Sequence, residues 1–378
     1  MKIGITCYPT YGGSGVVATE LGKSLAERGH EIHFISYGIP MRLNRLNEKI
    51  LYHEVEVSNY PLFEFPLYSL ALASKIVEVC EYENLDIIHV HYAIPHSVSA
   101  YLAKQILIEN KNNNVKVITT LHGTDITLVG LEPSFLPLVK FSIEKSDGVT
   151  AVSRFLKEKT ITNYQINKEI EVIYNFVDTD LYSPKPNCVY KSYFAPNGEK
   201  VLCHISNFRL VKRVPDVIKI FAKVREQIPC KLILAGDGPE RSECERLARE
   251  LGFNLKTDVF FLGKQEAVYD ILNASDLFIL PSQSESFGLS ALEAMGCGVP
   301  TITSSVGGLP ELVVHNETGF IAEIGDIERM AKYAIDLLTN NTKYKKFSEN
   351  ARNRAVQLYS KEKIVSQYEA FYQKVLNQ

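Results

Sequence analysis

The stretch Asp276–Met295, DLFILPSQSESFGLSALEAM, decides the fold because it joins a buried strand to a helix through a polar loop. The apolar run Asp276–Ser282 predicts the strand, and Ser290–Met295, rich in Ala, Leu, Glu and Met, predicts the helix. Ser286–Leu289 are then expected in the first helical turn, whose backbone N–H groups have no intrahelical partner. Such a helix start attracts phosphate oxygens or hydroxyls.

Two carboxylates flank this helix start, Glu285 and Glu293. Glu293 is expected about two turns further in, where a carboxylate can accept two hydrogen bonds from a vicinal diol such as a ribose. The alternative is structural, with Glu285 as a helix cap and Glu293 as a solvated surface charge. The other loops of the chain bear on this choice.

The same alternation of strand and helix runs along nearly the whole chain. Helical patterns such as Val16–Arg28 and Val214–Gln227 separate short β-rich runs, which predicts an α/β fold of doubly wound parallel sheets. Two Rossmann-like sheets fit the length better than one sheet of about twelve strands. The expected strands are KIGITCY, EIHFISY, DIIHVHY, KVITTLH, GVTAVS and EVIYN in the first half, and KVLCHIS, KLILAGDG, VFFLG, DLFILPS, PTITSS and GFIAE in the second.

A connector rich in proline and turn formers, Asp178–Asn197, separates the two halves. We therefore predict a first domain over residues 1–182 and a second over residues 183–359. After Asp326 the chain reads as helical, and its last helix, about residues 360–378, is expected to pack back on the first domain. Ligands of open α/β sheets bind at the carboxyl ends of the strands, so the two sheets are expected to face each other across a cleft.

Composition excludes several classes of function. With 378 residues, 46% hydrophobic and 22% charged, the chain has the balance of a globular protein of two domains. A net charge of −3 argues against general affinity for nucleic acid or acidic membranes. The seven scattered cysteines, free of C-x-x-C spacing, and the lack of a signal peptide or long apolar run predict a cytoplasmic protein without stable membrane insertion. Whether it forms a homo-oligomer is left open.

Glycines follow the first predicted strand, in Gly12-Gly13-Ser14-Gly15, just before a helix. This arrangement lets a ligand approach the backbone closely, and it also satisfies a loose G-x-G-x-x-A dinucleotide pattern. The next strand ends in Ile35–Tyr37 and offers no acid for a ribose diol. Nicotinamide or flavin chemistry is therefore disfavoured.

Histidines and an arginine follow later strands of the first half. His89 and His91 share one strand face, where an H-x-H metal site is conceivable, but no cysteine or carboxylate cluster accompanies them. His122 ends a strand before a glycine with Asp125 nearby, and cleft-facing and structural roles fit it equally. Arg154 follows the strand GVTAVS, where it suits a bidentate grip on a carboxylate or phosphate.

Three cations in the second half, Arg209, Lys212 and Arg213, lie between a strand and a helix start. They oppose the local helix dipole, so an anionic group such as a pyrophosphate is expected to compensate them. Glycine turns follow the neighbouring strands in Gly236–Glu240 and Gly307–Glu311. By contrast the D-x-D triplet Asp178–Asp180 sits in the connector, where capping and turn formation are expected instead of metal binding.

Together these motifs resemble the retaining glycosyltransferases of family four, which have the two-domain GT-B architecture. The matching segments, in family order over roughly Met1 to Ile327, are the GGSG loop, HGTD, the AVS strand before Arg154, NFVDTD, the basic loop, GDGPE, ESFGLSALEAMGCGVP and GGLPELV. Within the family the chain resembles the branch that transfers N-acetylglucosamine from UDP-GlcNAc to L-malate, the first step of bacillithiol synthesis. The segments that suggest this branch are ITCYPTYGGSGVVATELG, HVHYAIPHS, LHGTDITLVG, AVSRFLK and SNFRLVKRV.

The resemblance implies a role for each matching residue, without a metal or other cofactor. Arg209 and Lys212 would neutralise the pyrophosphate, Glu293 would bind the ribose, and His122 and Glu285 would hold the transferred sugar. The remaining donor contacts would come from Gly13, Gly236, Gly263, Ser286, Phe287, Gly288 and Leu289, with the uracil near Gly263–Glu266. The L-malate contacts would come from Ser14, Tyr92, Thr120 and Arg154.

The basic loop departs from the family pattern, which spaces its arginine and lysine five apart. Arg209 and Lys212 are three apart, and Asn207 holds the ungapped position. Lys212 is the firmer assignment because it keeps its offset to Phe221, and Arg213 is the alternative to Arg209.

The resemblance implies front-face transfer with retention, in which the leaving-group oxygen takes the proton of the acceptor. Three alternatives stay open: a UDP- or GDP-sugar hexosyltransferase with a glycan or lipid acceptor, a UDP-sugar epimerase, and a non-catalytic sugar-nucleotide sensor.

Overall fold

A computed structural model of the chain describes residues 1–378 apart from residues 11, 44–46, 58–63, 112 and 186–187. The described chain forms two compact units, unit 1 of Met1–Tyr174 with Glu362–Gln378, and unit 2 of Asn175–Lys361. The division therefore falls after Tyr174 and not after residue 182 as predicted. The proline-rich segment that follows belongs to unit 2, where Tyr182 and Asp178 make their contacts.

Unit 1 is built on a sheet of parallel strands in the order β3-β2-β1-β4-β5-β6-β7. The order reverses between β1 and β4, as in a Rossmann fold. The strands are β1 Lys2–Thr6, β2 Glu31–Ser36, β3 Ile50–Glu54, β4 Ile87–His91, β5 Lys116–Leu121, β6 Gly148–Ala151 and β7 Glu171–Val172.

Unit 2 repeats this plan with parallel strands in the order β10-β9-β8-β11-β12-β13. Here the order reverses between β8 and β11. The strands are β8 Lys200–Ile205, β9 Cys230–Ala235, β10 Val259–Gly263, β11 Leu277–Leu280, β12 Thr301–Ser304 and β13 Gly319–Ala322. The predicted fold class is confirmed, and each strand expected from the sequence is present.

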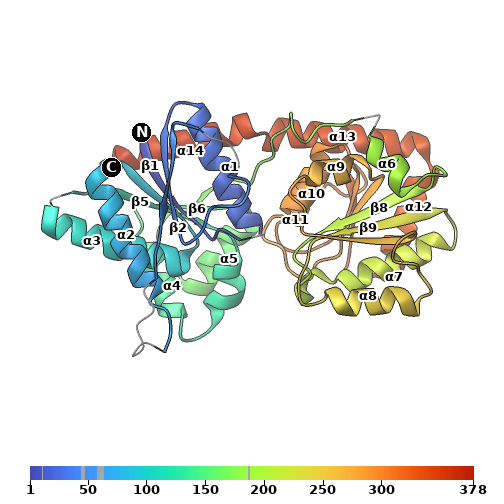
Figure 1. The fold of residues 1–378 in the computed structure, drawn as a ribbon, viewed down its shortest axis with the longest axis horizontal. Helices are drawn as coiled ribbons and strands as arrows, with labels where there is room; N and C mark the ends of the chain where they lie inside the picture. The colour runs from blue at the N-terminus through green and yellow to red at the C-terminus, as the bar shows by residue number, and fades with distance from the viewer. Residues whose placement is uncertain (11, 44–46, 58–63, 112, 186–187) are drawn as a thin grey trace. The chain divides into compact units, whose positions relative to one another are not determined.

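Helices connect the strands and flank each sheet (Figure 1). In unit 1 they are α1 Gly13–Glu27, α2 Tyr68–Glu83, η1 Ala93–Ser97, α3 Val98–Lys111, η2 Thr124–Leu128, η3 Val129–Leu131, α4 Leu136–Lys145, α5 Arg154–Tyr164 and, after the chain has returned from unit 2, most of α14 Lys361–Leu376. In unit 2 they are α6 Val189–Phe194, η4 Leu210–Lys212, α7 Val214–Arg225, α8 Arg241–Glu250, α9 Val268–Asn273, α10 Leu289–Gly296, α11 Leu309–Leu312, α12 Ile327–Thr339 and α13 Asn341–Tyr359.

The strand β3 was not predicted from the sequence. Its sequence ILYHE has no continuous apolar run, because it lies at the edge of the sheet with four half-buried residues and an exposed Glu54. Parallel pairing with β2 holds it in place, with Ile35 opposite His53. Its strand character therefore comes from its neighbour in the sheet.

The last helix, α14, is anchored in unit 1 by a buried chain of hydrogen bonds. Tyr372 Oη lies 2.7 Å from His89 Nδ1, and His89 Nε2 lies 2.7 Å from Thr120 Oγ1, which in turn lies 2.7 Å from Thr150 Oγ1. Burial lowers the pKa of His89 to about 3, so the imidazole is neutral and can accept from the phenol while donating to Thr120. At the surface, Arg28 pairs with Glu369 at 2.6 Å.

We predict that Tyr372→Phe destabilises unit 1 by about 1–3 kcal/mol, because His89 Nδ1 is left buried without its donor. The measurement is native-state hydrogen exchange of amides in β4 and β5. Tyr82→Phe, at a tyrosine that is 79% exposed, is the matched control and should change nothing. Equal protection in the two variants would contradict the assignment.

Candidate functional site

In each unit, a polar contact between two predicted site residues joins the two loops that leave the sheet where its strand order reverses. In unit 1, Ser14 Oγ after β1 lies 2.8 Å from Tyr92 Oη after β4. In unit 2, Lys212 after β8 forms an ion pair with Glu285 after β11. The carboxyl ends of strands at such a reversal are where open α/β sheets bind ligands. The structure thus brings predicted site residues together at both reversals.

The ion pair of unit 2 is partly buried and supported by its loops. The side chains of Lys212 and Glu285 are 19% and 12% exposed. Ser282 Oγ donates to Glu285 Oε1 at 3.1 Å, and the backbone N–H of Gln283 donates to the carbonyl of Val211 at 2.7 Å. Lys212 is therefore held at the sheet edge by an internal anion, whose place a phosphate can take.

The other two cations of the basic loop differ in their surroundings. Arg213 adopts a left-handed conformation with φ 51°, and its Nε donates to Asp216 Oδ2 at 2.6 Å. Arg209 is exposed at the start of η4, and among the described residues no ion pair is found for it. Since Arg213 already has an anion, Arg209 is the better placed of the two for a ligand.

The helix that carries Glu293 begins later than predicted. Ser286 and Phe287 lie in the loop, Gly288 precedes the helix with φ 96°, and α10 starts at Leu289. A residue with that φ cannot continue a right-handed helix, so the first turn is Leu289–Leu292. Glu293 consequently lies just over one turn into α10, and the predicted separation of two turns is wrong.

Glu293 is not a solvated surface charge. It is 5% exposed, and Tyr182 Oη donates to its Oε1 at 2.8 Å. Arg352 in turn donates to the backbone carbonyl of Tyr182 at 2.7 Å. Tyr182 thus orients the carboxylate, a role that its place in a proline-rich connector did not suggest. Binding of a diol by Glu293 stays a prediction.

Two glycine turns of unit 2 are explained by loop packing. A Cβ at Gly307, where φ is 57°, would lie 1.6 Å from the carbonyl oxygen of Glu285. A Cβ at Gly236, where φ is 126°, would lie 1.8 Å from that of Ser206. The backbone N–H of Gly236 also donates to the carbonyl of Gly263 at 2.7 Å. Close stacking of neighbouring loops requires these glycines, while donor contacts at Gly236 and Gly263 stay predictions.

In unit 1 the contact between Ser14 and Tyr92 lies at the start of α1. Gly13, the first residue of that helix, is exposed, and Ser14 is half-buried. Tyr92 has an unusual φ of 94°, and burial raises the pKa of its phenol to about 12. The phenol therefore stays protonated and can act as a hydrogen-bond donor near neutral pH.

Asp125 holds together the loops after β4 and β5. It is 2% exposed, and it accepts from the backbone N–H groups of Ala93 at 2.8 Å, Gly123 at 2.9 Å and His122 at 3.3 Å. Burial raises its pKa to about 6, against the opposing effect of these donors. The sequence shows Asp125 only as a neighbour of His122, yet in the fold its carboxylate positions that residue.

His122 is paired with a second histidine. Its Nε2 lies 2.8 Å from His91 Nδ1, and its ring centroid lies 5.4 Å from that of Tyr92. Burial lowers the pKa of His122 to about 3 and that of His91 well below its ordinary value. Both rings are neutral near pH 7, so His122 can offer a hydrogen bond to a ligand but no positive charge.

Two predicted acceptor residues have different surroundings. Thr120 is fully buried, and its hydroxyl is shared between His89 and Thr150, so its position does not support a direct contact with a ligand. Arg154 is exposed at the first position of α5, after β6, and the helix is capped by Ser153 Oγ, which accepts from Leu156 N at 3.1 Å. Its predicted role stays open to test.

The two metal-like motifs have structural roles. Asp178 Oδ1 accepts from the backbone N–H groups of Asp180 at 3.0 Å and Leu181 at 3.1 Å, while Oδ2 pairs with Lys361 at 2.9 Å. The predicted turn is confirmed. In the H-x-H pair, both ring nitrogens of His89 already have partners.

Comparisons with known proteins agree with this arrangement. A family model described as Glycosyltransferase Family 4 matches residues 11–181, and one described as Glycosyl transferases group 1 matches residues 190–354. The N-acetyl-alpha-D-glucosaminyl L-malate synthase of Bacillus anthracis is 51% identical over 377 residues, covering 100% of this chain and 97% of that protein.

Two solved structures share the fold. The Anabaena protein Alr3699/HepE in complex with UDP and glucose has a TM-score of 0.82 at 23% identity, covering 99% of this chain and 100% of that one. Sucrose-phosphate synthase from Thermosynechococcus elongatus has a TM-score of 0.81 at 21% identity, covering 100% and 99%. Among the helices that the structure describes, none has both the length and the apolar character to span a membrane.

The buried histidines predict that acid destabilises unit 1 before unit 2. A histidine with a lowered pKa binds fewer protons when folded, so the free energy of unfolding falls as the pH drops below about 6.5. Asp125 acts in the opposite sense, because its raised pKa lets the folded chain bind a proton between pH 6 and 4. Among described residues, the lowered histidines are His53, His89, His91, His96 and His122 in unit 1 and His204 in unit 2.

The measurement is hydrogen exchange read by mass spectrometry between pH 8 and pH 5, corrected for the intrinsic exchange rate. Peptides of unit 1 should lose protection more steeply than those of unit 2 below pH 6.5, and neither should change between pH 8 and 7. Earlier loss of protection in unit 2 would contradict the assignment.

Proposed function

The chain belongs to the family-four glycosyltransferases of the GT-B fold, enzymes that transfer a sugar, and on that basis we propose that its donor is UDP-GlcNAc and its acceptor is L-malate. The products are then UDP and N-acetyl-alpha-glucosaminyl L-malate, formed with retention at the anomeric carbon in the first step of bacillithiol synthesis. The printed name of the Bacillus anthracis relative supports this pair of substrates, at 51% identity over the full chain.

The proposed binding site for the UDP-sugar donor rests on one observation, the ion pair between Lys212 and Glu285 at the strand-order reversal of unit 2. A pyrophosphate offers Lys212 more negative charge than one carboxylate does, and Arg209 is exposed in the same loop. We expect an exchange of partners on binding, in which the pyrophosphate takes Lys212 and Glu285 turns to a hydroxyl of the sugar. Glu293, oriented by Tyr182, is the candidate for the ribose.

The acceptor half is assigned to unit 1. Malate carries two carboxylates and a hydroxyl, which need a cation and hydrogen-bond donors. Arg154 offers the cation, and Ser14 and Tyr92 offer hydroxyl groups at the strand-order reversal. His122 is neutral, and it suits a hydroxyl of the transferred sugar better than a carboxylate.

In the proposed reaction the bond between the anomeric carbon and the phosphate oxygen breaks, and its electron pair stays on UDP. The malate hydroxyl oxygen bonds to the anomeric carbon from the same face, and its proton passes to the leaving phosphate oxygen. Lys212 and Arg209 stabilise the negative charge that develops on UDP. In other transferases a divalent metal ion provides this stabilisation. Glu285, engaged by Lys212 and Ser282, acts in binding and not as a covalent nucleophile.

The decisive assay incubates the protein with UDP-GlcNAc and L-malate in the presence of EDTA. UDP and a new α-glycoside of malate in equal amounts are expected. Transfer to a glycan or lipid but not to malate would show that malate is not the acceptor. Formation of a second UDP-sugar and no glycoside would indicate an epimerase. Binding of UDP-GlcNAc without turnover would indicate a sensor.

Lys212→Ala should lower kcat by on the order of several hundred-fold, because the charge on the leaving UDP loses its cation. Lys223→Ala is the control, since that lysine lies on α7 and pairs with Glu328 at the surface. Thermal melting checks that both variants fold. A folded Lys212→Ala enzyme with a wild-type kcat would remove Lys212 from the mechanism.

Arg154→Ala should raise the KM for L-malate about tenfold or more while UDP binding is preserved, because one charge-assisted hydrogen bond to the acceptor is lost. Lys159→Ala removes a cation from the same helix and should leave both constants unchanged. Unchanged malate kinetics in Arg154→Ala would refute the acceptor assignment, while the donor assignment would stand.

A further inference from the structure

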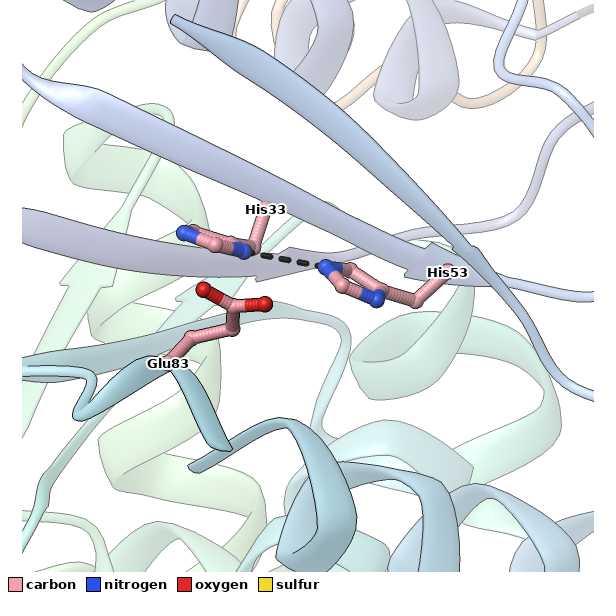
Figure 2. A group of neighbouring side chains, drawn as sticks. All are labelled: His33, His53 and Glu83. Atoms are coloured by element: carbon pink, nitrogen blue, oxygen red, sulfur yellow. Dashed lines mark hydrogen bonds between the residues drawn. The ribbon is translucent and has the colours of Figure 1, made fainter. Parts of the chain in front are cut away.

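Two histidines and a glutamate from three elements converge in unit 1, apart from the strand-order reversal. His33 lies in β2, His53 in β3 and Glu83 at the end of α2 (Figure 2). One ligand atom of each lies within 4.8 Å of the other two, and His33 Nδ1 is 2.9 Å from His53 Nε2. His33 is fully buried, while His53 and Glu83 are half-buried. The cluster therefore has a rigid inner ligand and two outer ones that solvent can reach.

The tautomer of His33 is set by a carboxylate behind it. Glu31 Oε1 lies 3.0 Å from His33 Nε2, and Glu31 also pairs with Lys2 at 2.9 Å. Glu31 therefore accepts a hydrogen bond from the Nε2–H group of His33, which leaves the Nδ1 lone pair directed into the cluster. A carboxylate that holds the far nitrogen in this way is the usual support of a histidine that binds a metal.

We propose that His33 Nδ1, His53 Nε2 and the Glu83 carboxylate bind a divalent transition-metal ion, with Zn²⁺ as the best match. Two imidazole nitrogens and one carboxylate form a ligand set typical of zinc, and the bond lengths of about 2.0–2.2 Å suit ligand atoms as close as these. His53 then carries its proton on Nδ1, so Nε2 can coordinate.

The position of the cluster indicates a structural role. Glu83 ends α2 shortly before β4 begins, and His53 lies in the edge strand β3, whereas ligands of such sheets bind at the carboxyl ends of the strands where the order reverses. The ion would join the edge strand β3 to β2 and to α2, and its test does not depend on which sugar the enzyme transfers. Without a metal, the same groups form a hydrogen bond in which His53 Nε2–H donates to His33 Nδ1.

The experiment uses the full chain without a histidine tag, treated with EDTA and dialysed. Isothermal titration with ZnCl₂ should show one ion per chain, and Zn²⁺ should raise the Tm. His53→Gln and Glu83→Gln should each weaken binding by more than about tenfold, and Glu31→Gln by about ten- to a hundredfold. Glu81→Gln, which removes an exposed carboxylate from α2, is the matched control and should bind as the wild type does.

Titration with Co²⁺ identifies the ligands. Absorption bands of a nitrogen- and oxygen-ligated ion are expected, and they should vanish in His53→Gln. A sulfur-to-cobalt charge-transfer band would place the ion on a cysteine and overturn the proposal. Absence of stoichiometric Zn²⁺ binding, or binding and Tm shifts unchanged in both ligand variants, would overturn it as well. Thermal melting in EDTA verifies that each variant folds. If His53→Gln does not fold, Glu83→Gln alone tests the proposal.

Discussion

The reversal of strand order in each parallel sheet is the constraint on which the rest of this structure depends. Between β1 and β4, and between β8 and β11, successive connections leave toward opposite faces, so two loops part at the carboxyl edge. Ser14 and Tyr92 meet there in unit 1, and Lys212 and Glu285 meet there in unit 2. The sheet core supplies the rigidity, and the loops at the reversal supply the chemistry.

The buried histidines beside the strand-order reversal of unit 1 are uncharged. His89, His91 and His122 lie among partners that offer hydrogen bonds but no compensating charge, and burial therefore lowers their pKa values. Asp125 brings one carboxylate into this region and satisfies it with backbone donors. Unit 1 thus has a fixed set of neutral hydrogen-bonding groups, and it loses stability in acid because protonation of the buried histidines opposes folding.

Unit 2 follows a different principle, because its site contains an ion pair. Lys212 is paired with Glu285, so an incoming anion must exchange partners with that carboxylate, whereas Arg209 is exposed in the same loop. Glycines at 236 and 307 allow the neighbouring loops to stack closely enough to hold these groups. Backbone contacts between neighbouring loops therefore help to position the cations of the basic loop.

The sequence by itself determined every strand except β3, the α/β class and the loops that carry Lys212, Glu285 and His122. Local pattern was enough for these, because apolar runs and glycine turns depend on near neighbours. Tertiary structure alone decided that Lys212 meets Glu285, 73 residues away, that Tyr182 orients Glu293, and that Thr120 is buried. It also decided that ILYHE is an edge strand and that His33, His53 and Glu83 converge. Pairing between strands and burial of side chains arise from segments distant in the chain, and no local spacing encodes them.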